Sequence, residues 1–321
     1  MRLMRAVVIL FVLGMPSLAR AVLPAPAQKA FGENLIQALV QLADEKDYQI
    51  GSEWGKRPVR AETLEGQSES FRRAALATAR LGGGTSFYLG KFNGHHMMAT
   101  NYHVFPKADL CSSRTAVFPL LNKRFACEKF YGNWPSIDLA LFAIRVDSSA
   151  DEAVLSKVAG NFNYNVTLYP GQELITIGFG VFRNSGRDLM ANDDRDCKVF
   201  SAKEDYRFIA DPDRINPADY KAWSFATGCD VSHGDSGSAM VDRMTGEVVG
   251  IIWTTATNKD SRVQDSAFLD EVLTRQSPEV WTQLSYAVPA PKMRDFLRDY
   301  LSQVRSSDPD LVPTLSAVIG D

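Results

Sequence analysis

From residue 84 onward, the sequence consists of short runs of β-forming residues separated by turns that contain Gly, Pro, Asn or Asp. Helical patterns do not alternate with these runs, as they would in a parallel sheet of βαβ units. Many short strands without interleaved helices predict an antiparallel sandwich or barrel. The runs are TSFYLG, HHMMAT, TAVFPLL, LALFAI, NVTLYP, ELITIGFG, KVFSA, SAMVD, EVVGIIWTT and LSYAVP.

The first 21 residues have the three parts of a secretory signal peptide. Arg2 and Arg5 are basic, Ala6–Met15 is an unbroken apolar stretch, and Ala19-Arg20-Ala21 offers a small-residue cleavage site. The apolar stretch is too short to cross a bilayer. We therefore predict that residues 1–21 are a signal peptide, that the protein is secreted or periplasmic, and that it has no membrane span.

The chain has four cysteines: Cys111, Cys127, Cys197 and Cys229. In the oxidising compartment that a signal peptide implies, they can pair, and four cysteines allow three connectivities. We favour the pairing of sequence neighbours, Cys111 with Cys127 and Cys197 with Cys229. The CxxC spacing of zinc sites is absent. Neither a metal nor a cofactor is predicted.

Two regions flank the β-rich part. Residues 22–80 are predicted to be an N-terminal extension or propeptide that is partly helical, with helical patterns at 30–46 and 68–80. Near the other end, the apolar spacing of Pro291–Val304 predicts one terminal helix. The Ser-, Asp- and Pro-rich residues 306–321 are expected to form a flexible tail.

The charge of the chain is modest, with a formal net charge of −3 and a pI near 5.9. This balance does not indicate a basic surface for nucleic acid, so no nucleic-acid partner is expected. The acidic run Asp193-Asp194-Arg195-Asp196 is interpreted as a solvated hairpin tip, with a weak calcium site as the alternative. A monomer is expected.

The sharpest motif is His233-Gly234-Asp235-Ser236-Gly237-Ser238. Glycine, small and acidic residues around one serine favour a tight turn that exposes the Ser236 hydroxyl. In such a turn the backbone N–H groups of Gly234 and Ser236 can converge on one point, which places a nucleophile beside an oxyanion hole. Because Gly/Ser turns are common, this motif alone does not separate acyl-transfer chemistry from a surface turn.

Two further features supply what a serine nucleophile needs. His103 lies just past the β-like run HHMMAT, and histidine is the natural base near neutral pH. Asp138 stands at the start of the apolar run LALFAI, so it is expected to be mostly buried. A buried carboxylate needs a partner, and an imidazole N–H is a suitable one. The order His, Asp, then GDSG favours a catalytic triad.

These motifs resemble those of trypsin-like serine peptidases, and TNYHV resembles the bacterial secreted branch that includes glutamyl endopeptidases. The resemblance spans about residues 82–303 and implies an all-β fold of two six-stranded antiparallel barrels with a C-terminal helix. It implies that His103 is the general base and acid, that Asp138 orients it, and that Ser236 attacks the carbonyl. Gly234 and Ser236 would form the oxyanion hole. The resemblance is carried by GTSFYLG, ATNYHV, IDLALFAI, GDSGSAMVD and EVVGIIW.

The same resemblance suggests residues that bind substrate. Asp230, six residues before the serine, corresponds to the floor of the primary pocket, where a carboxylate favours Arg or Lys. The alternative is a framework role tied to the disulfide of Cys229. His233 is expected at the rim of the pocket. Trp253 and Thr254 are expected on the edge that pairs with an extended substrate.

Residues 81–305 are therefore predicted to form one trypsin-like domain that hydrolyses protein or peptide substrates through an acyl-enzyme. A buried Asp235 needs a partner, which either a processed N-terminus within residues 22–65, as in a zymogen, or an internal Arg or Lys would supply. The insertion Asn258–Val280 is interpreted as a charged loop, with a lid as the alternative. The alternative function is a catalytically inactive protein of this fold that acts in binding or regulation.

Overall fold

The computed structural model describes residues 45–180, 188–213, 220–257, 259–275, 277, 280–306 and 308–321. All of them belong to one structural unit, Asp44–Asp321. The predicted signal peptide and nearly all of the helical pattern at 30–46 lie outside the described residues. Among the residues that the structure does describe, no helix is long and apolar enough to cross a membrane.

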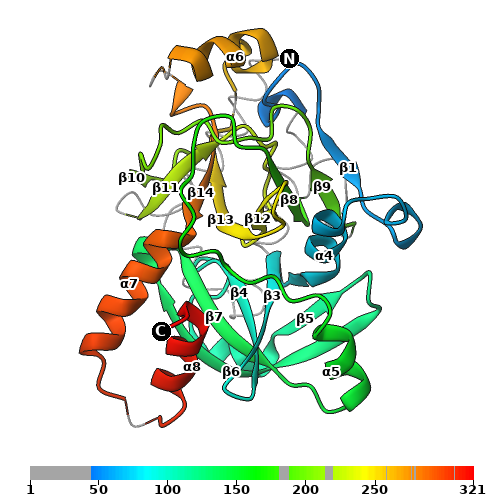
Figure 1. Ribbon diagram of the computed structural model, residues 1–321, viewed down its shortest axis with the longest axis vertical. Helices are drawn as coiled ribbons and strands as arrows, with labels where there is room; N and C mark the ends of the chain where they lie inside the picture. Colours follow the sequence, from blue (N-terminus) through cyan, green and yellow to red (C-terminus); the bar gives the residue numbers. More distant parts are fainter. Residues whose placement is uncertain are drawn as a thin grey trace, which may run out of the picture. The chain divides into compact units, whose positions relative to one another are not determined.

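Six antiparallel strands close into a barrel, in the order β2-β3-β4-β7-β6-β5 (Figure 1). Its core includes Tyr88, Met98, Phe118 and Phe142, none of them more than 1% exposed. Large side chains that point inward from every strand fill a barrel of this size. The strands are β2 (Thr78–Leu81), β3 (Gly84–Phe92), β4 (His95–Thr100), β5 (Thr115–Phe118), β6 (Lys123–Trp134) and β7 (Leu139–Ile144).

The remaining strands form an eight-stranded sheet in the order β1-β9-β8-β12-β13-β14-β11-β10. Its core includes Phe225, Met240, Val249 and Ile252. The second barrel was expected to have six strands, and this sheet has two more, one at each end. One is β10, which pairs with β11, and the other is β1, which comes from the N-terminal extension and pairs with β9. The strands are β1 (Lys56–Pro58), β8 (Leu174–Gly178), β9 (Met190–Asn192), β10 (Arg207–Ala210), β11 (Lys221–Thr227), β12 (Ala239–Asp242), β13 (Val248–Thr255) and β14 (Ser285–Pro289).

Helices occupy the connections and the C-terminal end. The side chain of Ser68 accepts a hydrogen bond from the N–H of Phe71 and so caps the first described α-helix. The α-helices are α4 (Glu69–Ala77), α5 (Ser149–Leu155), α6 (Ser266–Arg275), α7 (Ala290–Gln303) and α8 (Leu311–Ile319). The short 3₁₀ helices are η1 (Glu45–Asp47), η2 (Ala61–Thr63), η3 (Ala108–Ser113), η4 (Pro135–Ile137) and η5 (Ser261–Gln264).

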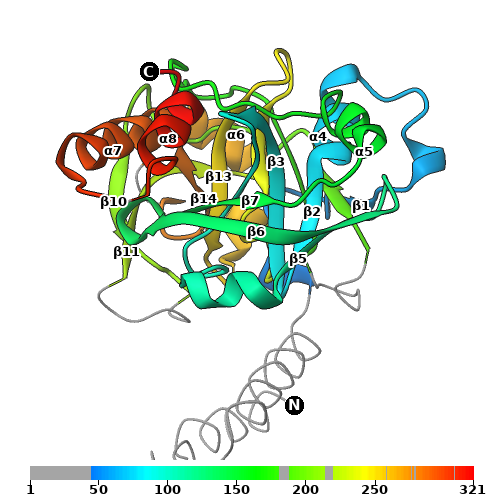
Figure 2. The ribbon, with the colours of Figure 1, turned by 90° about the horizontal axis from the view of Figure 1, so that it is seen from below.

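The C-terminal residues differ from the expected flexible tail. Residues 311–319 form α8, which packs beside α7 and contacts β3 (Figures 1 and 2). Leu315 is fully buried and Ile319 is 2% exposed, because the apolar side chains of this segment cover the outside of the first barrel. The expectation failed because the Ser/Asp/Pro composition ends at about Pro313, and the residues beyond it are mostly apolar.

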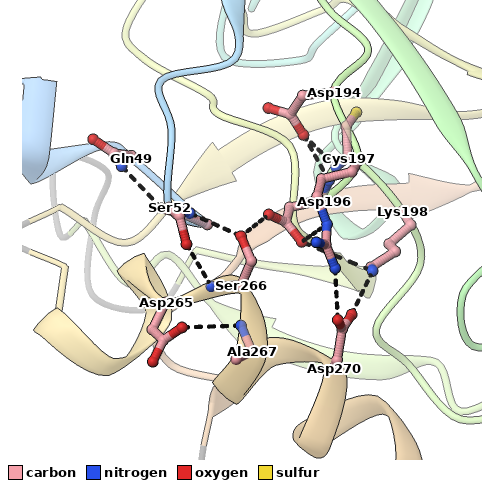
Figure 3. Close-up of polar contacts among 12 residues, drawn as sticks. Gln49, Ser52, Asp194, Asp196, Cys197, Lys198, Asp265, Ser266, Ala267 and Asp270 are labelled. Carbon is pink, nitrogen blue, oxygen red and sulfur yellow. Dashed lines mark hydrogen bonds and ion pairs between the residues drawn. The ribbon is translucent and has the colours of Figure 1, made fainter.

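The N-terminal extension is fastened to the eight-stranded sheet by the cluster drawn in Figure 3. Ser52 and Ser266 exchange hydrogen bonds of 2.9 and 3.0 Å, and the Ser266 hydroxyl donates to Asp196 at 2.5 Å. Asp196 is only 3% exposed, so the acidic run is solvated only in part, with Arg195 exposed. Ser266 also begins α6, which occupies part of the insertion interpreted as a loop.

Two disulfide bonds join the pairs that the sequence favours. Cys111–Cys127 connects η3 with β6 in the first barrel. Cys197–Cys229 connects the segment after β9 with the segment that leads to Ser236. Each bridge closes a loop in its own half of the fold and so restricts the unfolded chain.

Candidate active site

The turn that carries Ser236 requires glycine at two positions. Gly234 has a φ of +98° and Gly237 a φ of +89°, in the left-handed region that other residues rarely adopt. A Cβ atom on Gly234 would lie 2.3 Å from the carbonyl oxygen of Phe179, and one on Gly237 would lie 2.1 Å from that of Thr85. The GDSG sequence fits this turn because only glycine has both the backbone freedom and the space.

Two N–H groups of the same turn are available to a ligand. Within the described part of the chain, the N–H groups of Gly234 and Ser236 donate to no protein acceptor. By contrast, the N–H groups of Asp235 and Gly237 donate to carbonyl oxygens at 3.0 and 2.9 Å. Backbone N–H groups are nearly always paired, so two free donors on one turn are what an oxyanion hole requires.

His103 and Asp138 are brought together by neighbouring strands of the barrel. His103 follows the end of β4, Asp138 directly precedes β7, and these strands pair with Thr100 opposite Ala140. The Nδ1 of His103 lies 2.9 Å from Asp138 Oδ2, and the His103 backbone N–H donates to Oδ1 at 3.2 Å. Asp138 is fully buried and has a φ of +34°, a conformation that Asp tolerates better than most residues.

The start of β3 holds the serine turn next to the histidine. A Cβ atom on Gly84 would lie 2.8 Å from a methyl of Val104 and 3.1 Å from the carbonyl oxygen of Ser236. Thr85 donates its N–H to the same carbonyl oxygen at 2.8 Å and its hydroxyl to the carbonyl of Gly234 at 2.7 Å. The residue after His103 and the Ser236 turn therefore pack against the same short segment.

The surroundings of His103 are acidic. Burial lowers the pKa of His103, but the charge of Asp138, the hydrogen bond to it and the nearby Asp211 outweigh that effect. The pKa of His103 therefore lies above its ordinary value of 6.5. A more basic imidazole takes a proton from a hydroxyl more readily, but it is itself protonated in mild acid.

Asp235 has an internal cation as its partner. The ammonium of Lys56, on β1, forms an ion pair with Asp235, and the two side chains are 3% and 2% exposed. The other contacts of the carboxylate are the N–H of Gly180 at 3.0 Å, and the N–H and hydroxyl of Ser232 at 2.8 and 3.2 Å. Lys56 is one of the internal basic residues that the sequence leaves open, but no motif singles it out.

Tyr220 is a second residue that the sequence does not reveal. Its hydroxyl donates a hydrogen bond to Asp138 Oδ1, and Tyr220 is 9% exposed. It stands immediately before β11, in the eight-stranded sheet, whereas Asp138 belongs to the first barrel. The contact spans 82 positions of sequence, so no local pattern announces it.

Asp230 faces the N-terminal extension. One carboxylate oxygen accepts the N–H of Ile50 and the other that of Gly55, both at 2.7 Å, and the residue is fully buried. Burial and the charge of Asp194 raise the pKa of Asp230 well above its ordinary value. An open pocket floor is therefore not the role these contacts support. They support the alternative interpretation, a framework role.

The other predicted substrate residues lie around a pair of acids. His233 Nε2 is 3.3 Å from Asp213 Oδ2, and the hydroxyl of Thr254 donates to Asp211 Oδ1. Trp253 is 1% exposed, so its side chain is part of the core, and only the backbone of β13 is suited to pairing with substrate.

A closed antiparallel barrel and a second β-sheet, with a glycine-bounded serine turn packed beside a histidine–aspartate pair, define a serine peptidase of the chymotrypsin fold. The profile of the family described as "Trypsin-like peptidase domain" matches residues 84–251, just over half of the chain. The chain therefore belongs to the trypsin-like peptidase family and is a serine endopeptidase.

Two bacterial proteases are among the solved structures to which this chain is similar. An inactive form of Rv3671c from M. tuberculosis H37Rv is 14% identical, covers 78% of this chain and 98% of its own, and has a TM-score of 0.49. The active form of that protease is 15% identical, with 75% and 86% coverage and a TM-score of 0.48. The serine endoprotease from Yersinia pestis is 17% identical, with 73% and 66% coverage and a TM-score of 0.43. A search of curated proteins finds no match.

Proposed function

We propose that this endopeptidase cleaves protein or peptide substrates through a triad of Ser236, His103 and Asp138. His103 takes the proton of the Ser236 hydroxyl as it attacks the carbonyl, and then gives that proton to the leaving amine. Asp138 holds the imidazole and stabilises its charged form. The observation that carries the proposal is the contact of His103 Nδ1 with the buried Asp138 at 2.9 Å, beside a turn with two free N–H groups.

The two N–H groups without a described acceptor support Gly234 and Ser236 as the oxyanion hole. The tetrahedral intermediate places a negative oxygen where these N–H groups converge, and each such donor is worth about 10²–10³ in kcat in serine peptidases. Water then hydrolyses the acyl-enzyme, with His103 acting as base a second time.

The triad predicts covalent labelling of one serine. A fluorophosphonate probe should label the folded protein and leave Ser236→Ala unlabelled, because the probe reacts only with an activated hydroxyl. Labelling is read by mass spectrometry, and Ser238→Ala, two residues away, is the matched control and should still be labelled. Absence of labelling of the native protein would support the alternative, an inactive protein of this fold that binds or regulates.

We also propose that the described part of the extension belongs to the active enzyme. The support is that Lys56 neutralises Asp235 beside the nucleophile, and Ile50 and Gly55 satisfy Asp230. Any zymogen processing would then have to cut upstream of these contacts. Secretion or export to a periplasm follows from the signal-like residues 1–21, and the two disulfides are consistent with it.

For substrate preference, we propose Arg or Lys at the cleavage position, favoured by Asp211 and Asp213 in place of Asp230. The support is that the charge of Asp211 raises the pKa of His103, which places Asp211 near the catalytic base. Asp211 also accepts a hydrogen bond from the hydroxyl of Thr254, and Asp213 lies 3.3 Å from His233. Two carboxylates near the scissile bond favour a cationic side chain. The positive charge of the buried Lys259 would weaken this preference. Burial lowers the pKa of Lys259 to about 7, although the charges of Asp230 and Asp213 act to raise it.

Peptide-library profiling should therefore show a preference for Arg or Lys that Asp213→Asn lowers by about tenfold, the effect of one charge at close range. The measured quantity is the kcat/KM for an Arg substrate divided by the kcat/KM for an apolar substrate. The protonation of His103 affects both values equally and so does not change their ratio. This ratio should rise between pH 6 and pH 8, as Lys259 loses its proton. Glu173→Gln is the charge control, because it removes an exposed acid that pairs with Arg243. A preference for Glu or bulky apolar residues would refute the proposal.

A further inference from the structure

The carboxylate of Asp138 is held by donors from both halves of the fold. His103 contributes its backbone N–H and Nδ1, at 3.2 and 2.9 Å from the two carboxylate oxygens. Tyr220 contributes its hydroxyl to Oδ1, the oxygen that does not face Nδ1. With Oδ1 fixed on one side by Tyr220, the carboxylate cannot rotate away from the imidazole without losing a charge-assisted hydrogen bond.

Tyr220 is itself held by aromatic neighbours. Its ring stacks on Tyr102, with centroids 5.8 Å apart and planes 21° apart, and packs edge-on against Trp253 at 5.8 Å. Trp253 is anchored in turn by a 2.9 Å hydrogen bond from its indole to Ser224. Packing of this kind fixes the direction in which the hydroxyl points, so the hydroxyl is preorganised and does not depend on a mobile side chain.

The hydroxyl can act only as a donor to Asp138. Burial and the charge of Asp138 raise the pKa of Tyr220 far above its ordinary value, so it keeps its proton over the whole range in which a peptidase works. A carboxylate beside a permanently protonated phenol shares its negative charge with that phenol.

We propose that Tyr220 is a positioning residue for the catalytic acid, whose hydroxyl aims Asp138 at His103, shares its charge and keeps water from it. The proposal rests on the roles of His103 and Asp138 in the proposed function. It adds that the acid of the first barrel is aligned by the eight-stranded sheet, so both halves of the fold contribute to the histidine–aspartate pair.

The substitution Tyr220→Phe tests the hydroxyl and keeps the ring. We expect kcat to fall about tenfold with little change in KM, because one hydrogen bond to a charged group is lost and the ring still packs. In the wild type, kcat/KM should fall in acid through an apparent pKa above 6.5, because His103 must be neutral to act as base. In Tyr220→Phe the apparent pKa of this acid limb of the pH profile should rise by about half a pH unit. The charge of Asp138 is then no longer shared with a phenol and stabilises the imidazolium of His103 more strongly.

A second measurement does not depend on turnover. The pKa of the His103 imidazole is followed by NMR in Ser236→Ala and in Ser236→Ala/Tyr220→Phe, and the same upward shift is expected. The other titratable groups that act on this cluster, Asp211 and Tyr102, are unchanged between the two proteins. This arm tests Tyr220 even if the native protein fails to turn over substrate.

Tyr164→Phe is the control, because Tyr164 is also a buried tyrosine but lines a separate cavity of about 200 Å³ next to α8. It should leave kcat and the acid limb unchanged. The proposal is overturned if Tyr220→Phe keeps the wild-type kcat and the wild-type titration of His103. It is equally overturned if Tyr220→Phe only lowers thermal stability, as a purely structural residue would.

Discussion

Replacing His103 by alanine should lower kcat by about 10⁶-fold, because Ser236 then has no base and its hydroxyl is a poor nucleophile. Asp138→Asn should cost less, about 10⁴-fold, because it leaves the imidazole in place but favours the wrong tautomer. The measurement is hydrolysis of an arginine peptide by purified protein, with folding checked by circular dichroism.

The matched control for this series is His95→Ala. His95 lies on β4, the strand that leads to His103, but its ring packs against Tyr131 and lies near Asp310, among the C-terminal residues. Its replacement should leave kcat unchanged. If His103→Ala kept more than about one hundredth of the activity, His103 would not be the base.

Lys56→Met should also have a large effect, because it leaves the charge of Asp235 buried without a cation. Removing one partner of a buried ion pair costs about 3–5 kcal/mol of folding free energy. Asp235 lies in sequence between the two proposed oxyanion donors, so movement of its carboxylate should disturb both of them. We expect kcat to fall by about 10²–10³-fold, the cost of losing an oxyanion donor, with a smaller change in KM.

Arg57→Met is the matched control, since Arg57 is the next residue on β1 and also pairs with an aspartate, Asp193, at 2.8 Å. Its side chain is 36% exposed, so its pair should contribute less than about 1 kcal/mol. The double variant Lys56→Met/Asp235→Asn removes the orphaned charge and should regain part of the lost stability. Equal effects of Lys56→Met and Arg57→Met on kcat would contradict the role of Lys56.

Local patterns in the sequence identified the candidates for the chemistry. His103, Asp138 and Ser236 each stand at the edge of a strand or in a glycine turn, so a few neighbouring residues are enough to predict their setting. The disulfide pairs were also predictable, because each joins cysteines close in sequence. The second sheet was predicted less well, since the three residues of β1 lie in a polar stretch and gain their strand geometry only from pairing with β9.

The supporting residues were beyond prediction for a physical reason. Lys56 and Tyr220 act through contacts 179 and 82 positions away along the chain. A lysine in a polar stretch and a tyrosine before a strand have many ordinary roles, and only the folded chain selects this one. Asp230 shows the converse case. Its position in the motif suggests a substrate contact, but its carboxylate already accepts hydrogen bonds from two backbone N–H groups of the extension.

The ion pair of Lys56 and Asp235 also links activity to completion of the fold, because the two residues are 179 positions apart along the chain. Lys56 is synthesised long before Asp235, and contacts between such distant positions form late in folding. Until β1 has paired with β9, the Ser236 turn lacks its cation, so we expect a newly made chain to be much less active than the folded enzyme. By the same connection, we expect a chain that loses this segment to proteolysis to lose most of its activity, as Lys56→Met should.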